Sequence, residues 1–263
     1  MRLYTFILPF IARAALAQTS LDSLAAAASV GTARFADRRA AAAEGYRRIG
    51  ADFPGMGEHW LHPGALLTGA IDPKRPTLLI YATIDGAPKL LGVGFVTTTR
   101  AGETAHDVPG WPHAWHEHSG LLTDESGVSP GTNAPSGTHV WVLHAWTGLA
   151  NPDGVFTPDN WSLPFLRAGF AAPLHSDPDA ARALALLNGG DVYVRGVLTD
   201  GGLVTPANAA TTDSTLARAR RDADDAGADP AALARVWHAL AADLRAQLGP
   251  NVDRLLAVPH RHQ

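Results

Sequence analysis

The stretch TLLIYATIDGAPKLLGVGFVTT, residues 77–98, decides the fold class. Its two halves, 77–83 and 89–98, are rich in aliphatic and β-branched residues, and residues 84–88 between them carry the Asp-Gly pair of a tight turn. Two such runs joined by a short Asp-Gly loop predict a β-hairpin. A run of the same character, THVWVLHAW at residues 138–146, predicts a third strand. We therefore expect an antiparallel β core that consists of the hairpin and this strand.

Helical patterns precede and follow the β core. Residues 20–50 are rich in Ala and Arg, and their apolar residues recur roughly with a helical period. Residues 212–226 and 230–248 are also helical in pattern, and the second segment has Asp229 as an N-cap and Gly249 as a stop signal. The predicted class is α+β, with helices flanking the β core at its N- and C-terminal ends.

Three shorter segments complete the predicted elements. Residues 50–64 contain two Pro-Gly pairs, which predict a loop. Residues 178–187 predict a short helix with proline at its first position, and residues 191–198 predict a strand. The expected parts of the chain are a leader at residues 1–17, an N-terminal helical segment at 18–50, a β-rich core with histidine and tryptophan loops at 51–200, and a C-terminal helical region at 201–263 that packs on the core.

Composition excludes some classes of protein. The chain has 263 residues, of which 46% are hydrophobic and 17% charged, so it can bury a sizeable core. Its formal net charge is −4, and its 21 Lys and Arg residues are scattered. A nucleic-acid groove needs clustered basic residues to neutralise phosphates. We therefore expect no nucleic-acid partner.

The N-terminus resembles a secretory signal peptide. Arg2 precedes a short apolar stretch at residues 3–12, and Ala15 and Ala17 offer a small-residue cleavage site. The pattern predicts export, to the periplasm or outside the cell, after cleavage near Ala17; an ordinary amphipathic N-terminal helix is the alternative. No other segment approaches the ~20 apolar residues of a membrane-spanning helix. We thus expect no transmembrane segment in the mature chain.

Histidines are the residues that most suggest chemistry. The chain contains 12 of them and no cysteine, so a metal site would have to use nitrogen and oxygen ligands. Neutral imidazole is the commonest protein ligand for zinc and copper. Most of the histidines gather in GEHWLHPG, in the segment that ends in PHAWHEHSG, and on the third strand. They are His59, His62, His106, His113, His116, His118, His139 and His144.

Spacing refines this set. In an extended segment His116 and His118 point the same way and could chelate one ion, with Glu117 facing away. His139 and His144 are five residues apart, so they face opposite sides of the third strand. His144 shares its face with the more apolar residues of that strand and is the better candidate for a buried ligand.

Tryptophans allow a different interpretation. Aromatic rings near the same segments could form a platform on which a saccharide stacks, although core packing is the ordinary use of such large side chains. The five concerned are Trp111, Trp115, Trp141, Trp146 and Trp161. The sequence has no Gly-x-Ser-x-Gly elbow, no phosphate-binding P-loop and no His-Glu-x-x-His helix, so it names no enzyme class.

Several motifs resemble a family of exported bacterial proteins of unassigned function. The matching stretches are TARF (32–35), AAEGY (42–46), GMGEHW (55–60), IDPKRP (71–76), LHAW (143–146) and NPDGVF (151–156). The likeness covers roughly residues 32–165. It implies secretion, a Gly-x-Gly-x-His-Trp/Tyr loop and a Leu-His-x-Trp strand followed by Asn-Pro-x-Gly-x-Phe, and it raises His59 and His144 above the other histidines. The chain departs from the family at Gly94, where an acidic residue is usual, and at His62, where asparagine is usual.

The leading hypothesis from the sequence is an exported metal-binding protein. Its metal is a divalent transition metal, zinc or copper, because the donors are imidazoles and only two methionines are present. An open coordination position would allow a metal-dependent hydrolase or oxygenase. The competing hypothesis is a metal-free module that binds a small molecule or saccharide through exposed tryptophans. The predicted metal ligands are His59, His116, His118 and His144, with His62, His139 and Glu117 in reserve.

Overall fold

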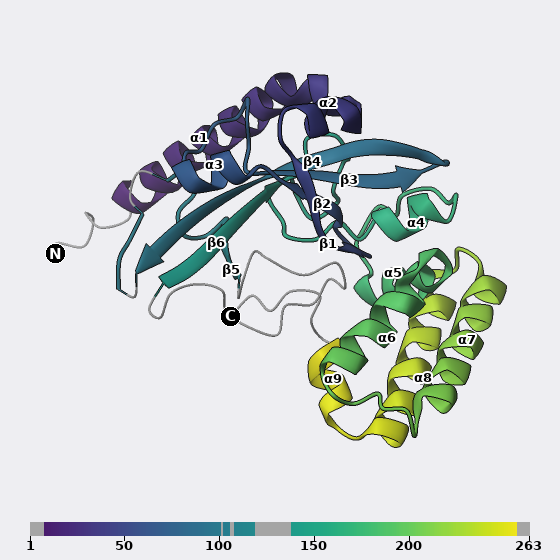
Figure 1. The fold of residues 1–263 in the computed structure, drawn as a ribbon. Helices are drawn as coiled ribbons and strands as arrows, with labels where there is room; N and C mark the ends of the chain where they lie inside the picture. Colours follow the sequence, from purple (N-terminus) through teal and green to yellow (C-terminus); the bar gives the residue numbers. More distant parts are fainter. Residues whose placement is uncertain (1–7, 101, 106–107, 119–137, 257–263) are drawn as a thin grey trace, which may run out of the picture.

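The computed structural model describes residues 8–100, 102–105, 108–118 and 138–256; the side chains of residues 8–19, His118 and Thr138 are not described. The described residues form a six-stranded antiparallel sheet of order β1-β2-β3-β4-β6-β5 (Figure 1). The strands are β1 Arg47–Phe53, β2 Gly57–Leu61, β3 Leu78–Ile84, β4 Ala87–Arg100, β5 His116–His118 and β6 Thr138–Ala145. The chain therefore has the predicted α+β fold with an antiparallel β core.

The predicted hairpin is β3 and β4, and the predicted third strand is β6. Asp85 and Gly86 connect β3 to β4 with φ of 54° and 72°. Positive φ at both central residues is typical of the tight turn that matches the twist of the flanking strands, and Asp-Gly suits it. Strand β6 pairs with β4 on one side and with β5 on the other.

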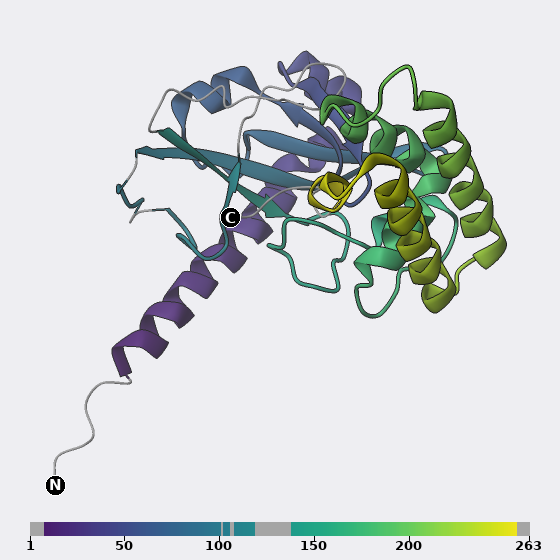
Figure 2. The same ribbon diagram turned by 90° about the horizontal axis from the view of Figure 1, so that it is seen from below.

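One face of the sheet is covered by N-terminal helices (Figure 1). These are α1 (Leu8–Thr32) and α2 (Arg38–Ala43), with a short 3-10 turn, η1 (Ala33–Ala36), between them. Leu21, Leu24 and Ala28 of α1 are buried in one apolar cluster with sheet residues such as Phe95 and Leu143. Figure 2 shows α1 extending beyond the sheet at its N-terminal end. The helices α1 and α2 therefore cover only one of the two faces of the sheet.

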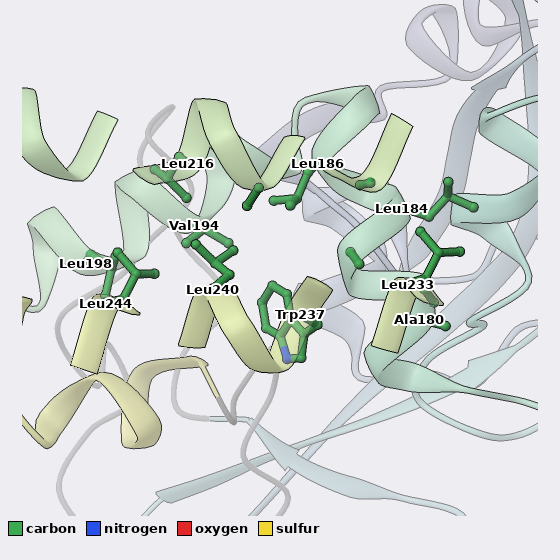
Figure 3. Close-up of a cluster of buried hydrophobic side chains, with 14 of the residues drawn as sticks. Ala180, Leu184, Leu186, Val194, Leu198, Leu216, Leu233, Trp237, Leu240 and Leu244 are labelled. Atoms are coloured by element: carbon green, nitrogen blue, oxygen red, sulfur yellow. The ribbon is translucent and has the colours of Figure 1, made fainter. Parts of the chain in front are cut away.

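Residues 163–256 form a helical unit beside the sheet (Figures 1 and 2). Its helices are α4 Leu163–Arg167, α5 Pro178–Ala185, η2 Leu186–Asn188, α6 Gly190–Asp200, α7 Ala209–Ala226, α8 Pro230–Leu248 and α9 Asn251–Leu256. Figure 3 shows its core, in which Trp237 of α8 lies among leucine and valine side chains from several helices. Arg167 joins the two parts of the molecule, because its Nη2 lies 2.7 Å from an Asp52 oxygen on β1.

Helix α8 has the predicted bounds. Asp229 is the N-cap, and its carboxylate accepts hydrogen bonds from the backbone N–H groups of Ala231 and Ala232 at 3.0 and 3.3 Å. Proline at the first position needs no such partner, since it has no N–H. The buried residues Leu233, Trp237, Leu240 and Leu244 recur every three to four positions along one face. The predicted helix at 178–187 is confirmed as α5 continued by the 3-10 turn η2.

Two predicted segments are wrong. Residues 191–198 form helix α6 and not a strand, because Gly190, Val194 and Leu198 recur every four residues and are buried on one face. Residues 50–64 are not a loop, since they contain most of β1, all of β2 and the start of α3 (Pro63–Thr68). The glycine signal marks only the tight connection between the two strands, where Gly57 has φ of 77°.

The predicted leader overlaps α1. Residues 1–7 lie outside the described part of the chain, and residues 8–17 are the first part of α1. Among the described residues, no helix combines the length and the apolar character that crossing a bilayer requires. Cleavage near Ala17 and export stay predictions. Within the segment 51–200, the described strands end at Ala145, and the helices of the C-terminal helical unit begin at Leu163.

Candidate metal centre

Three of the predicted ligands lie together on the face of the sheet opposite α1. His59 comes from β2, His116 from β5 and His144 from β6, and their exposed fractions are only 6%, 6% and 2%. The ring centroid of His144 lies 5.4 Å from that of His59 and 5.0 Å from that of His116. We call these three residues the histidine cluster.

Strand alternation explains which face the cluster occupies. Leu143 and Ala145 belong to the apolar cluster under α1, so His144 between them points to the opposite face. His116 pairs with Val142, two residues before His144, and therefore shares its face. Three different strands, β2, β5 and β6, thus contribute one histidine each.

Glycines on β4 help the rings to approach one another. Strands β3 and β4 lie between β2 and β6 in the sheet, so the rings of His59 and His144 must reach across them. Gly94 pairs with His144, and a Cβ added at Gly94 would lie 3.5 Å from Cδ2 of His144 and 3.0 Å from the Leu78 side chain. A Cβ here would thus crowd Leu78 and fill the space beside the His144 ring. In the sequence, only the Gly-Val-Gly pattern at 92–94 indicates that side chains are absent at this point of the strand.

A backbone hydrogen bond orients His144. Its Nδ1 lies 2.7 Å from the carbonyl oxygen of Pro158, and a carbonyl can only accept, so Nδ1 donates. In the neutral ring the lone pair is then on Nε2. Trp146 holds the loop that contains Pro158, because its Nε1 donates to the Thr157 carbonyl at 2.7 Å. A carbonyl bound to the second nitrogen of a histidine is a usual arrangement around protein-bound metals.

Aromatic rings enclose the cluster. The Phe53 ring lies 5.6 Å from that of His59, and the Trp146 ring lies 6.2 Å from that of His144. Such surroundings keep bulk water away from the imidazole rings. Within the described residues, however, no group of three or more His, Cys, Asp or Glu side chains is arranged so that it could hold a metal ion. Metal binding would therefore require the His59 and His116 rings to turn about χ2, a broad torsion in histidine, while His144 keeps its hydrogen bond to Pro158.

The remaining predicted ligands lie elsewhere or outside the description. His118 is the last residue of β5, paired with Val140, and its side chain is outside the described part. His139 and Glu117 form an ion pair with each other, His139 Nδ1 to Glu117 Oε1, and both side chains are partly exposed. His139 belongs to the opposite face of β6 from His144. The structure therefore separates this pair from the histidine cluster.

His62 has a structural role in the described chain. It is the N-cap of α3, where its Nδ1 accepts a hydrogen bond from the Ala65 N–H at 2.9 Å. Its Nε2 lies 3.0 Å from the carbonyl oxygen of Glu44, to which it donates. Both ring nitrogens are thus engaged in holding α3 against the end of α2.

Sequence reasoning missed Asp159. Burial raises the pKa of this carboxyl to about 6, against a smaller lowering by the Arg182 charge. Its Oδ1 is buried and has no hydrogen-bond partner in the described part of the molecule. No spacing pattern indicates such a residue, because its environment is formed by helices that follow later in the chain.

Tryptophans are mostly used in packing. Trp115, Trp146 and Trp161 are buried, so these three do not form an exposed platform. Trp111 and Trp141 are half-buried and contact each other edge to face, with ring centroids 4.8 Å apart.

Comparisons with family models, with curated proteins and with solved structures gave no match. Membership of the exported family that the motifs resemble is therefore still a prediction. The structure does place the departure at Gly94 directly opposite His144. An acidic residue at this position would adjoin the histidine cluster, and this chain has none there.

Proposed function

We propose that the protein binds a divalent transition metal, zinc or copper, through His59, His116 and His144. The single observation that carries the proposal is the proximity of three buried imidazole rings from three different strands. His118, on the same short strand as His116, is the proposed fourth ligand.

Ring spacing supports this assignment. Two imidazoles that share a tetrahedral zinc at about 2.0 Å have ring centroids roughly 5 Å apart. The centroid distances of 5.4 and 5.0 Å agree with that value. Packed aromatic rings also lie at such distances. Hydrocarbon side chains, however, would fill this space at a lower desolvation cost, so the choice of three imidazoles favours a use for their nitrogens.

The donor set selects the metal. The chain has no cysteine and only two methionines, which leaves imidazole as the principal donor. Imidazole suits zinc and copper(II), whereas thiolate and thioether ligands select copper(I). A bound zinc ion would act as a Lewis acid, and water in an open position would make a hydrolase or oxygenase role possible. The cluster itself accounts for binding and orientation of the ion only.

Metal analysis of untagged protein tests the proposal. The terminal residues His260 and His262 should first be changed to alanine, because a histidine-containing tail binds metals adventitiously. We expect near-stoichiometric zinc or copper that is lost in His59→Ala and in His144→Ala. His113→Ala, at an exposed position, is the matched control and should retain the metal.

A second measurement separates ligand loss from unfolding. Cobalt(II) added to metal-free protein should give the visible spectrum of a tetrahedral nitrogen site, with affinity at least about 100-fold weaker in folded His144→Ala. Circular dichroism of the metal-free variants shows whether they fold. Folded His59→Ala and His144→Ala proteins that bind cobalt as tightly as the control would overturn the proposal.

A further inference from the structure

A pocket in the helical unit has the character of a second binding site. Aromatic side chains of Trp161, Tyr193 and Trp237 line it, together with Arg182 and aliphatic residues such as Val197. The pocket is a shallow, partly open depression, and its enclosed part has room for only about 30 Å³. Its lining of aromatic and aliphatic side chains with one charged group is typical of small-molecule sites, and an occupant would have to be small and would stay partly exposed.

Arg182 is the polar group in this aromatic wall. Its guanidinium carbon lies 4.9 Å from the Trp161 ring centroid and 5.9 Å from that of Trp237. Cation–π contacts of this kind hold the planar group in a fixed orientation. Nη1 donates to Asp179 at 2.8 Å, whereas Nε is buried and has no hydrogen-bond partner among the described residues. One nitrogen of an oriented donor group is therefore available to an occupant of the pocket.

Neighbouring charges restrict the class of occupant. The Asp179 carboxylate balances the Arg182 charge and also lies 2.9 Å from His238 Nε2. Asp159 lies close enough to Arg182 and Tyr193 to affect the electrostatics of both. An anion would meet these carboxylates, and a cation would meet the guanidinium that already occupies the indole faces. An uncharged molecule avoids both costs.

We propose that the pocket bounded by Trp161, Tyr193 and Trp237 binds a small, flat, uncharged ring compound with a hydrogen-bond acceptor oxygen. The aromatic walls take the ring, since offset and edge-to-face contacts between aromatic groups are favourable. Arg182 Nε donates a hydrogen bond to the oxygen. Asp179 keeps the guanidinium neutralised and in place.

This site is distinct from the histidine cluster. The Phe53 ring lies between them, with its centroid 5.6 Å from that of His59 and 5.8 Å from that of Tyr193. None of the residues that line the pocket belongs to the cluster. The pocket proposal therefore does not depend on the metal, and metal-free protein serves equally well in its test.

Three probes of similar size separate the elements of recognition. Benzamide has the ring and a neutral acceptor oxygen, benzoate carries a negative charge, and toluene has no acceptor. Ligand-detected NMR of the full-length protein should show binding of benzamide, with toluene and benzoate about tenfold weaker or more, because a hydrogen bond to a charged donor is lost or opposed. Absence of benzamide binding, or equal affinity for all three probes, would overturn the proposal.

Matched variants locate the binding. Val197→Phe fills the pocket and should abolish benzamide binding, whereas Val192→Phe, on the same helix but 71% exposed, should leave it unchanged. Arg182→Met should weaken benzamide but not toluene, because only the acceptor loses a partner. Equal weakening of both probes would indicate a merely structural role for Arg182. Unchanged benzamide affinity in folded Val197→Phe protein would place the binding elsewhere and contradict the proposal.

Discussion

The sheet and the helical unit bury polar side chains in different ways. In the helical unit, the buried hydroxyls of Thr212 and Thr215 each donate to a carbonyl four residues earlier, both at 3.1 Å. Those groups are satisfied within one helix. In the sheet, His59 and His144 occupy buried strand positions where their ring contacts come from other strands. Buried polar groups that need distant residues require a reason beyond stability, and this difference directs attention to the sheet.

The largest expected effect is that of metal removal, which should destabilise the sheet more than the helical unit. A ligand present at about a thousand times its dissociation constant stabilises the folded state by about 4 kcal/mol. Chelation should therefore lower the thermal midpoint, and hydrogen exchange should accelerate in β2 and β6 more than in α7 and α8. Uniform acceleration across sheet and helices would contradict a site confined to the sheet.

Truncation of a side chain in the helical core should destabilise the protein without changing its affinity for the metal. Leu233 is fully buried in that core, and Leu233→Ala should cost about 3 to 4 kcal/mol in the free energy of unfolding, because it leaves a cavity. Urea denaturation measures this loss. Metal affinity of the folded variant should equal that of the unchanged protein, and a parallel loss of affinity would show that the two parts are not independent.

The buried carboxyl of Asp159 makes the free energy of unfolding depend on pH. Its ordinary pKa of 3.8 is raised to about 6 in the folded protein, so the folded state binds the proton more tightly than the unfolded state. The contribution of Asp159 to the free energy of unfolding is therefore most favourable below pH 4, and it is lost as the pH rises through 6. Asp159→Asn should remove this fall and be more stable than the unchanged protein at pH 7.5 by about 2 to 3 kcal/mol.

Urea unfolding at pH 4.5 and 7.5 checks that prediction. The exposed residue Asp222 supplies the control Asp222→Asn, which should follow the unchanged protein at both pH values. Parallel profiles for Asp159→Asn and the unchanged protein would show that the buried carboxyl does not carry the effect.

The smallest expected effect is at the start of α8. Asp229→Ala removes a side chain that accepts two backbone hydrogen bonds, which should cost about 1 kcal/mol. Asp229→Ser keeps an oxygen at the cap and should recover most of the loss in thermal unfolding. A loss of several kcal/mol would mean that the cap supports more than the first turn of this helix.

Local patterns predicted much of the fold. The Asp-Gly turn at Asp85 and Gly86, and the cap and stop of α8, act through neighbouring residues, so the sequence alone indicates them. The segment Asp191 to Leu198 was ambiguous, because a short apolar run fits either period until its packing partners are known. Its burial against other helices selects the helix.

Part of the candidate site was predictable, and part was not. Alternation along β6 correctly separates His144 from His139, because the period of two is a local property. The approach of His59 to His144 depends on the order of strands in the sheet and on Gly94 between them. Neither His62 as a helix cap nor Asp159 as a buried acid follows from spacing, since both roles depend on tertiary neighbours.

Phe53 has a consequence for how the two proposed sites would communicate. Its ring contacts His59 of the histidine cluster on one side and Tyr193, which lines the pocket, on the other. An occupant that displaces this ring changes the binding free energy at the other site. Thermodynamic linkage makes that change reciprocal. If the metal ion increased the affinity of the pocket for a ring compound, the ring compound would increase the affinity of the histidine cluster for the ion by the same factor.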